Sequence, residues 1–198
     1  MAIAEETVTA ARAHGNPFWI AHALLGYGRA FTLSDPARAL TILRQGLDYT
    51  RQHRLPLLEA AIARYAAPLE AVPGDLDQAL ALFDTTIDSL HRAGNVVLLA
   101  ATLAALAGFF DRIEQPEIGA TIYGTIAHHA NINTVINLPA VLHHLRATLG
   151  DTVFHACVAT GAAMEPPDAV QYARAQIQTA RRELGDAPRT PPPADGDD

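Results

Sequence analysis

The sequence predicts an all-α protein built from stacked pairs of antiparallel helices. Three observations predict it. Apolar residues recur at spacings of three and four over almost the whole chain, and strand-like alternation is absent. Residues that start and stop helices appear at regular intervals. The chain also resembles itself when it is shifted by about one two-helix repeat, so that Asp35 falls on Asp75. Together these observations favour a short right-handed helical array with a period of about 40.

Ten helices are expected from the apolar spacing and from the breaks between segments. "HGNP" at 14–17 ends the first helix, and "SDP" at 34–36 offers a capping residue followed by a first-turn proline. "VPGD", "AGN", "QPE", "LGD" and "EPPD" mark later boundaries. The predicted helices span 2–13, 17–32, 36–53, 56–71, 76–93, 96–113, 116–130, 139–149, 151–163 and 167–184.

The repeat alignment matches both core positions and turn punctuation. Besides the two aspartates, it superposes a set of small and large apolar residues: Ala39 on Ala79, Leu40 on Leu80, Leu43 on Phe83, Leu47 on Ile87, Leu57 on Val97 and Ala61 on Ala101. A second alignment, at nearly twice that shift, places Ala21 on Ala100. An Ala- and Leu-rich helical chain aligns to itself easily, but matched punctuation favours true two-helix repeats. The abundant alanines, 39 in all, are expected to let paired helices approach closely.

The repeats predict one domain over residues 1–185. Repeats are expected near 1–34, 35–74, 75–115 and 116–137, followed by capping helices over 138–185. The remaining segment, 186–198, is acidic and proline-rich, a composition that predicts disorder.

Composition excludes several function classes. All 14 basic residues are Arg, so the chain has no lysine for a Walker-type phosphate loop, a Schiff base or a Ser-Lys hydrolase. A single cysteine, Cys157, excludes a disulfide framework. The net charge of −7 argues against direct binding of nucleic acid. No apolar run is long enough to span a membrane and no secretory signal is visible, so the cytoplasm is the expected location.

The two-helix units resemble the tetratricopeptide-like sensor arrays of actinobacterial, including mycobacterial, MalT-like and LuxR-type transcriptional regulators and of cyclase-linked signal-transduction ATPases. The segment 116–130 resembles the last repeat of that family, and 138–170 resembles its closing helices. The residues that carry this second likeness are Leu149, Gly150, Asp151, Phe154, Gly161 and the turn from Glu165 to Asp168.

The resemblance implies a helical sensor or protein-interaction module of a regulator. The family's ATPase core and its DNA-binding helix-turn-helix have no counterpart in these residues, so neither activity is carried over. The first helix resembles the second half of a longer one, and we expect a truncated or split relative of a larger regulator.

A polar stripe is the main candidate for a binding surface. Arg44, Asp48 and Arg51 share one face of a predicted helix, and the equivalent positions of the next repeat hold Asp84, Asp88 and His91. His128 extends the stripe into the third copy. In helix-pair arrays the first helices line the concave surface, so this stripe is a candidate groove for a ligand or peptide. The alternative is an ordinary solvated face.

The histidine pairs His128-His129 and His143-His144 are weak candidates for a metal site. Adjacent helical residues point about 100° apart, given about 3.6 residues per turn, so neither pair chelates one ion readily. Cys157 has His155 two residues before it, a spacing at which helical side chains do not face each other. We therefore expect surface histidines, a buried structural cysteine, no metal and no cofactor.

The sequence leads to a non-catalytic regulatory or protein-interaction module as the first functional hypothesis. The aromatic cluster Phe18, Trp19, Tyr27 and Phe31 predicts an exposed apolar end that recruits a protein partner or a second copy of the chain. The alternative is a sensor of a small-molecule effector, which a pocket lined by Arg and Tyr would favour over an open groove. A metal-dependent enzyme using the histidine pairs and a degenerate remnant without independent function are further alternatives.

Overall fold

The computed structural model of the chain describes residues 2–72, 75–129 and 137–186. Within these ranges the chain forms nine α-helices and no strand, which confirms the all-α prediction. The helices are α1 (Ala2–His14), α2 (Pro17–Phe31), α3 (Pro36–Gln52), α4 (Pro56–Glu70), α5 (Leu76–Arg92), α6 (Val96–Arg112), α7 (Pro116–Ile126), α8 (Leu138–Ala162) and α9 (Pro166–Asp186). No helix in the described ranges has both the length and the apolar character to cross a bilayer.

The helix starts lie where the punctuation predicts them, because short polar side chains cap them. The Asp35 carboxylate accepts the backbone N–H of Arg38 at 3.1 Å, and the Asp75 carboxylate accepts that of Gln78 at 3.0 Å. Asn95 caps α6 in the same way. Such a bond satisfies one of the donors that a helix N-terminus leaves without an intrahelical partner.

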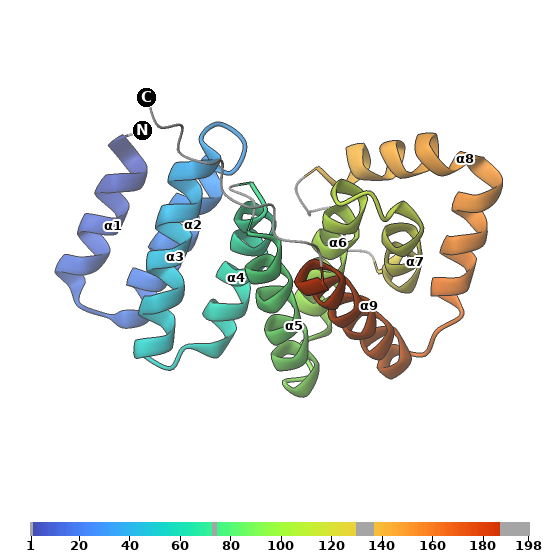
Figure 1. Cartoon of the computed structure of the whole chain (residues 1–198). Coiled ribbons are helices and arrows are strands. Elements are labelled where there is room, and N and C mark those ends of the chain that lie inside the picture. The colour runs from blue at the N-terminus through green and yellow to red at the C-terminus, as the bar shows by residue number, and fades with distance from the viewer. Residues whose placement is uncertain (1, 73–74, 130–136, 187–198) are drawn as a thin grey trace, which may run out of the picture.

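Residues 138–162, labelled α8, consist of two helical arms that meet at a kink, which confirms the predicted break between helices 139–149 and 151–163. Gly150, at the kink, is non-helical, with φ 73° and ψ 159°. Glycine adopts this left-handed conformation without the penalty of a Cβ, so the chain bends there without a connecting loop. Figure 1 shows the two arms of α8 meeting at this corner. Helix α7 ends at Ile126, before the predicted end at 130. Residues 130–136 lie outside the described residues, as do residues 187–198 of the tail predicted to be disordered.

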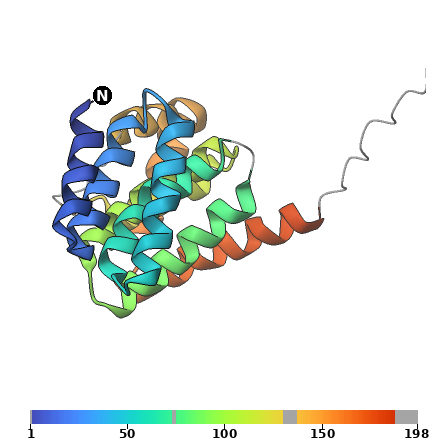
Figure 2. The same ribbon diagram turned by 90° about the vertical axis from the view of Figure 1, so that its left-hand side faces the viewer.

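Consecutive helices pack side by side from α1 to α8, and α2, α4 and α6 also contact one another in a second row. Helix α9 breaks this order. It returns to α5 and α7 instead of extending the stack, and Figures 1 and 2 both show it running alongside α5. The C-terminal helix thus covers a surface in the middle of the array.

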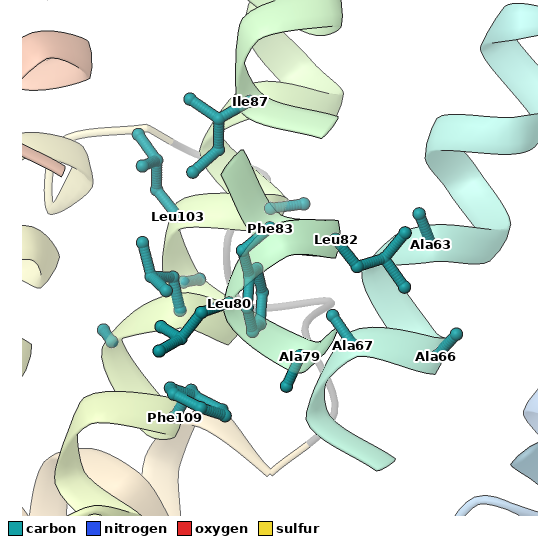
Figure 3. Close-up of a cluster of buried hydrophobic side chains, with 14 of the residues drawn as sticks. Ala63, Ala66, Ala67, Ala79, Leu80, Leu82, Phe83, Ile87, Leu103 and Phe109 are labelled. Atoms are coloured by element: carbon teal, nitrogen blue, oxygen red, sulfur yellow. The ribbon is translucent and has the colours of Figure 1, made fainter. Parts of the chain in front are cut away.

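The core is continuous from α3 to α9 and includes many alanines beside large apolar side chains. In Figure 3, Ala63, Ala66 and Ala67 of α4 face Ala79 and Leu82 of α5, while Phe83 lies near Phe109 of α6. Phe83 and Phe109 are fully buried, with ring centroids 5.5 Å apart in an edge-to-face arrangement.

The alanines predicted to pack closely are buried at five of six positions. Ala21, Ala39, Ala79, Ala100 and Ala101 are inaccessible or nearly so, whereas Ala61 is half-buried.

Candidate functional site

The predicted polar stripe does not form one open groove, because α9 lies over its central part. Arg174 of α9 donates from Nε to Asp84 Oδ1 at 2.7 Å and from Nη1 to Asp88 Oδ1 at 2.9 Å. Gln178 donates to the same Asp84 carboxylate at 3.2 Å. Further along α5, Arg181 Nε donates to Asp77 Oδ1 at 2.7 Å. The face of α5 expected to bind a ligand or peptide is therefore occupied by the chain itself.

These ion pairs shift the pKa values of the groups that form them. The hydrogen bond from Arg181 lowers the pKa of Asp77 and outweighs the opposing effect of desolvation. The hydrogen bonds to Asp84 and Asp77 raise the pKa values of Arg174 and Arg181 respectively. Because each shift favours the charged form, the contact between α5 and α9 is strongest when all the groups are ionised.

The α3 part of the stripe is also engaged with neighbouring residues. Arg44 donates from Nε to Glu70 Oε1 at 2.9 Å and pairs with the second carboxylate oxygen as well. The Glu70 side chain is only 3% exposed, so Arg44 neutralises a buried charge of α4. Arg51 lies 3.8 Å from Asp48 and donates to Glu59 at 2.9 Å. The ion pairs of Arg44 with Glu70 and of Arg51 with Glu59 join α3 to α4, so these arginines have a structural role.

The two histidines of the stripe lie apart from these ion pairs. His91 is exposed in the last turn of α5, and His128 is exposed just after α7. The rings of His128 and His129 stack with centroids 5.1 Å apart. His144 Nδ1 lies 2.9 Å from both carboxylate oxygens of Asp111. The described residues contain no group of three or more His, Cys, Asp or Glu side chains arranged to hold a metal ion.

Cys157 is partly buried and packs against the small cluster of Ala120, Leu145 and Phe154. The Nδ1 of His155, the histidine two residues before it, lies 2.7 Å from the backbone oxygen of Asp151.

A pocket of about 340 Å³ lies on a different part of the molecule, between the end of α2 and helices α4, α6 and α8. Its size falls in the range of small-molecule sites. Most of the exposed wall is apolar, although seven of the sixteen described lining residues are polar or charged. The lining comprises Thr32, Leu33, Arg64, Tyr65, Pro68, Leu69, Ala104, Ala105, Gly108, Asp111, Arg112, Asn137, Leu138, Ala140, Val141 and His144.

Two arginines in this wall lack a carboxylate partner within the described residues. Arg64 donates from Nη2 to the Tyr65 hydroxyl at 2.9 Å, while its buried Nε finds no acceptor among the residues that the structure describes. Arg112 donates from Nη2 to the backbone oxygen of Pro68 at 3.0 Å. No ion pair within 4.0 Å involves either residue in the described part of the chain.

Burial lowers the pKa of both guanidinium groups, most strongly through desolvation. The positive charge of Arg29 lowers the pKa of Arg64 further, and the carboxylate of Asp111 partly offsets the effect at Arg112. A charged group held away from water without a counter-ion is costly, and an anion in the pocket would relieve that cost.

Arg64 and Arg112 were not among the site residues predicted from the sequence, although the repeat alignment contains one indication of Arg64. In the repeat alignment Arg64 falls on Ala104, which is only 2% exposed. An arginine at the position of a core alanine indicates a buried charge. Sequence analysis also missed Arg174 and Arg181. Their spacing along α9 equals the spacing of Asp77 and Asp84 along α5, and this match fits an antiparallel pairing of the two helices.

Comparison of this chain with protein-family models, with curated proteins and with solved structures finds no match.

Proposed function

We propose that this chain is a non-catalytic regulatory module that senses a small-molecule effector. The observation that supports the proposal best is the pocket between α2, α4, α6 and α8, whose mainly apolar wall includes Arg64, a charged residue with no carboxylate partner among the described residues. Sites for small molecules are mostly apolar hollows in which a few placed polar groups fix orientation. The sequence hypotheses named a pocket lined by Arg and Tyr as the feature favouring an effector sensor, and Arg64 and Tyr65 line this one.

The proposal includes a repeat architecture related to the sensor arrays of MalT-like and LuxR-type regulators. The helix starts support it because they recur at a fixed interval: α3, α5 and α7 begin at Pro36, Leu76 and Pro116, and α4 and α6 begin at Pro56 and Val96. Asp35 and Asp75, which the repeat alignment pairs, cap their helices with equivalent hydrogen bonds. On this architecture the pocket lies against the second helices of successive repeats, and α9 fills part of the surface formed by the first helices.

The experiment is a screen of neutral, cationic and anionic fragments by methyl nuclear magnetic resonance, with Ala105 and Val141 as reporters in the pocket wall. We expect fragments that shift these two methyl signals, and no shift of the remaining Val141 signal in Ala105→Phe, which places a ring in the pocket. Val153, exposed on the second arm of α8 and not part of the pocket wall, is the control methyl. A collection that leaves the pocket methyls unmoved in the wild type would refute the effector function.

A second candidate function, assembly with a protein partner, is favoured by an apolar row along one edge. Phe18, Leu57 and Val97 hold the second position of α2, α4 and α6, and α4 contacts both α2 and α6. Their exposed fractions are 46%, 54% and 53%. Exposed apolar residues that gather on one face are typical of interaction surfaces.

The partner to test first is a second copy of the chain. Sedimentation velocity over a range of concentrations should show association that is lost in the triple variant with serine at 18, 57 and 97. Leu33→Ser is the matched control, because Leu33 is 76% exposed but follows the end of α2, outside the row. A monomer at every concentration would exclude self-association through this edge.

A further inference from the structure

The charges around the pocket do not balance. Arg64 and Arg112 contribute two guanidinium groups, and Arg29 adds its field from outside the wall. The only acidic residue in the described lining is Asp111, and His144 already lies 2.9 Å from both of its carboxylate oxygens. With the histidine neutral, the pocket carries a net positive charge, and with it protonated the excess is larger. An anionic group is the complement that such a wall lacks.

Arg64 is the residue best placed to receive that group. Its Nη2 is committed to the Tyr65 hydroxyl and its guanidinium carbon lies 4.4 Å from the centre of the Tyr65 ring, so the side chain is held in place. Its Nε is buried and has no acceptor among the described residues. Nearly all buried donors in proteins are paired, so this side chain, which lines the pocket, carries a positive charge that the described residues compensate poorly.

The wall also limits the charge and shape of the ligand. A planar carboxylate matches the planar donor fork of a guanidinium. A dianion such as phosphate would meet Asp111, whose side chain is 8% exposed in the same wall. The apolar part of the wall, which includes Leu69, Ala105, Leu138 and Val141, favours a ligand with an apolar body.

From these observations we infer that the pocket binds a monocarboxylate with an apolar body, its carboxylate seated on Arg64 and its body against α6 and α8. The inference rests on the proposed effector function and names the chemical class of the effector. Binding would neutralise the excess positive charge and remove apolar surface from water. A neutral or a cationic molecule with the same body would supply only the last of these contributions.

The test uses 4-phenylbutyrate, its primary amide, acetate and inorganic phosphate as probes, with calorimetry and with the Ala105 and Val141 methyl signals as readouts. We expect 4-phenylbutyrate to bind at least tenfold more tightly than the amide, which has the same body without the charge. Acetate, which has the charge without the body, should also bind at least tenfold more weakly.

Arg64→Met should weaken 4-phenylbutyrate binding at least tenfold and leave amide binding within about twofold, since methionine retains much of the apolar stem. Arg182→Gln is the control, because Arg182 belongs to α9 and lies outside the pocket wall. It should leave every affinity unchanged. Arg64→Met removes a desolvated charge, so we expect it to unfold no earlier than the wild type, and its thermal unfolding curve checks that lost binding is not lost folding.

The outcomes separate the two levels of the proposal. Equal binding of the amide and the carboxylate at the pocket methyls refutes the monocarboxylate while retaining the effector function. Tighter binding of phosphate than of 4-phenylbutyrate also overturns the assigned class. If neither these probes nor the broader fragment screen moves the pocket methyls, both the ligand class and the effector function fail.

Discussion

Gly161 is the position at which a single methyl group should cost the most. Helices α7 and α8 approach so closely that a Cβ on Gly161 would overlap the backbone oxygen of Thr121 and would lie 2.9 Å from the backbone nitrogen of Thr125 and 3.0 Å from Gly124 Cα. The opposing residue, Gly124, meets the Val158 carbonyl in the same way. All of these obstacles are backbone atoms, which cannot rotate away as a side chain can.

The expected loss follows from two opposing contributions. An ordinary contact between a carbon and a carbonyl oxygen is about 3.3–3.6 Å, so α7 and α8 must move apart to admit the methyl group. Overpacking of this kind costs about 1–3 kcal/mol and at times more. Replacing glycine by alanine inside a helix recovers about 0.8–1.0 kcal/mol of helix propensity. We therefore expect Gly161→Ala to lower the free energy of unfolding by up to about 2 kcal/mol.

Gly26→Ala provides the matched control, because Gly26 lies inside α2 and a Cβ there would meet nothing within 4 Å. The same substitution should stabilise the protein by about 0.4–1 kcal/mol. Thermal unfolding followed by circular dichroism measures both, and for a chain of this size a change of about 1 kcal/mol shifts Tm by about 2–4 °C. If Gly161→Ala is as stable as Gly26→Ala, the close approach of α7 and α8 is wrong.

Three further predictions concern the ion pairs. Arg174→Ala should lower the free energy of unfolding by about 1–2 kcal/mol, and a double-mutant cycle with Asp84→Asn by urea denaturation should show positive coupling; additive losses would mean that the pair does not hold α9 to α5. Arg44→Met should lower the free energy of unfolding in the same assay, because it leaves the buried Glu70 carboxylate without its partner. We expect a loss of about 2–3 kcal/mol, below the roughly 3–5 kcal/mol for a fully buried pair, since Arg44 is itself half exposed. Unchanged stability would show that water satisfies this carboxylate. Asp77 has a lowered pKa in the folded state, so its contribution is present above the ordinary value of about 3.9 and is lost as the pH falls through the folded value. The difference in Tm between the wild type and Asp77→Asn should therefore shrink as the pH is lowered from 6 to 3, and a constant difference would contradict the ion pair.

The position of α9 changes what substitutions in the polar stripe can report. As a solvated face or an open groove, the stripe could lose Asp88 without a loss of stability. In the structure Asp88 is 26% exposed and pairs with Arg174 of α9 and Arg92 of its own helix. A weakened partner interaction in Asp88→Ala would therefore have to be separated from a loosened C-terminal helix.

Local sequence patterns were enough to predict the helices. Asp35, Asp75 and Asn95 predict where helices start, because a capping residue bonds to the backbone a few positions further along the chain. Apolar residues three and four apart predict which helix face is buried. The corner in α8 shows where that information ends. A glycine before an aspartate predicts a break at residue 150, but the neighbours packed on each arm decide whether the break becomes a loop or a bend.

The candidate sites also depend partly on local sequence and partly on tertiary structure. The sequence by itself determined the helical fold class, the composition of the polar stripe and the lack of lysine chemistry. Only the tertiary structure decided that α9 fills the stripe and that Arg64 and Arg112, far apart in the chain, share one pocket wall. The physical reason is that charge pairing and desolvation depend on distances across the fold. A sequence shows the arginine, but only the packed neighbours show whether a carboxylate, a tyrosine hydroxyl or an open pocket faces it.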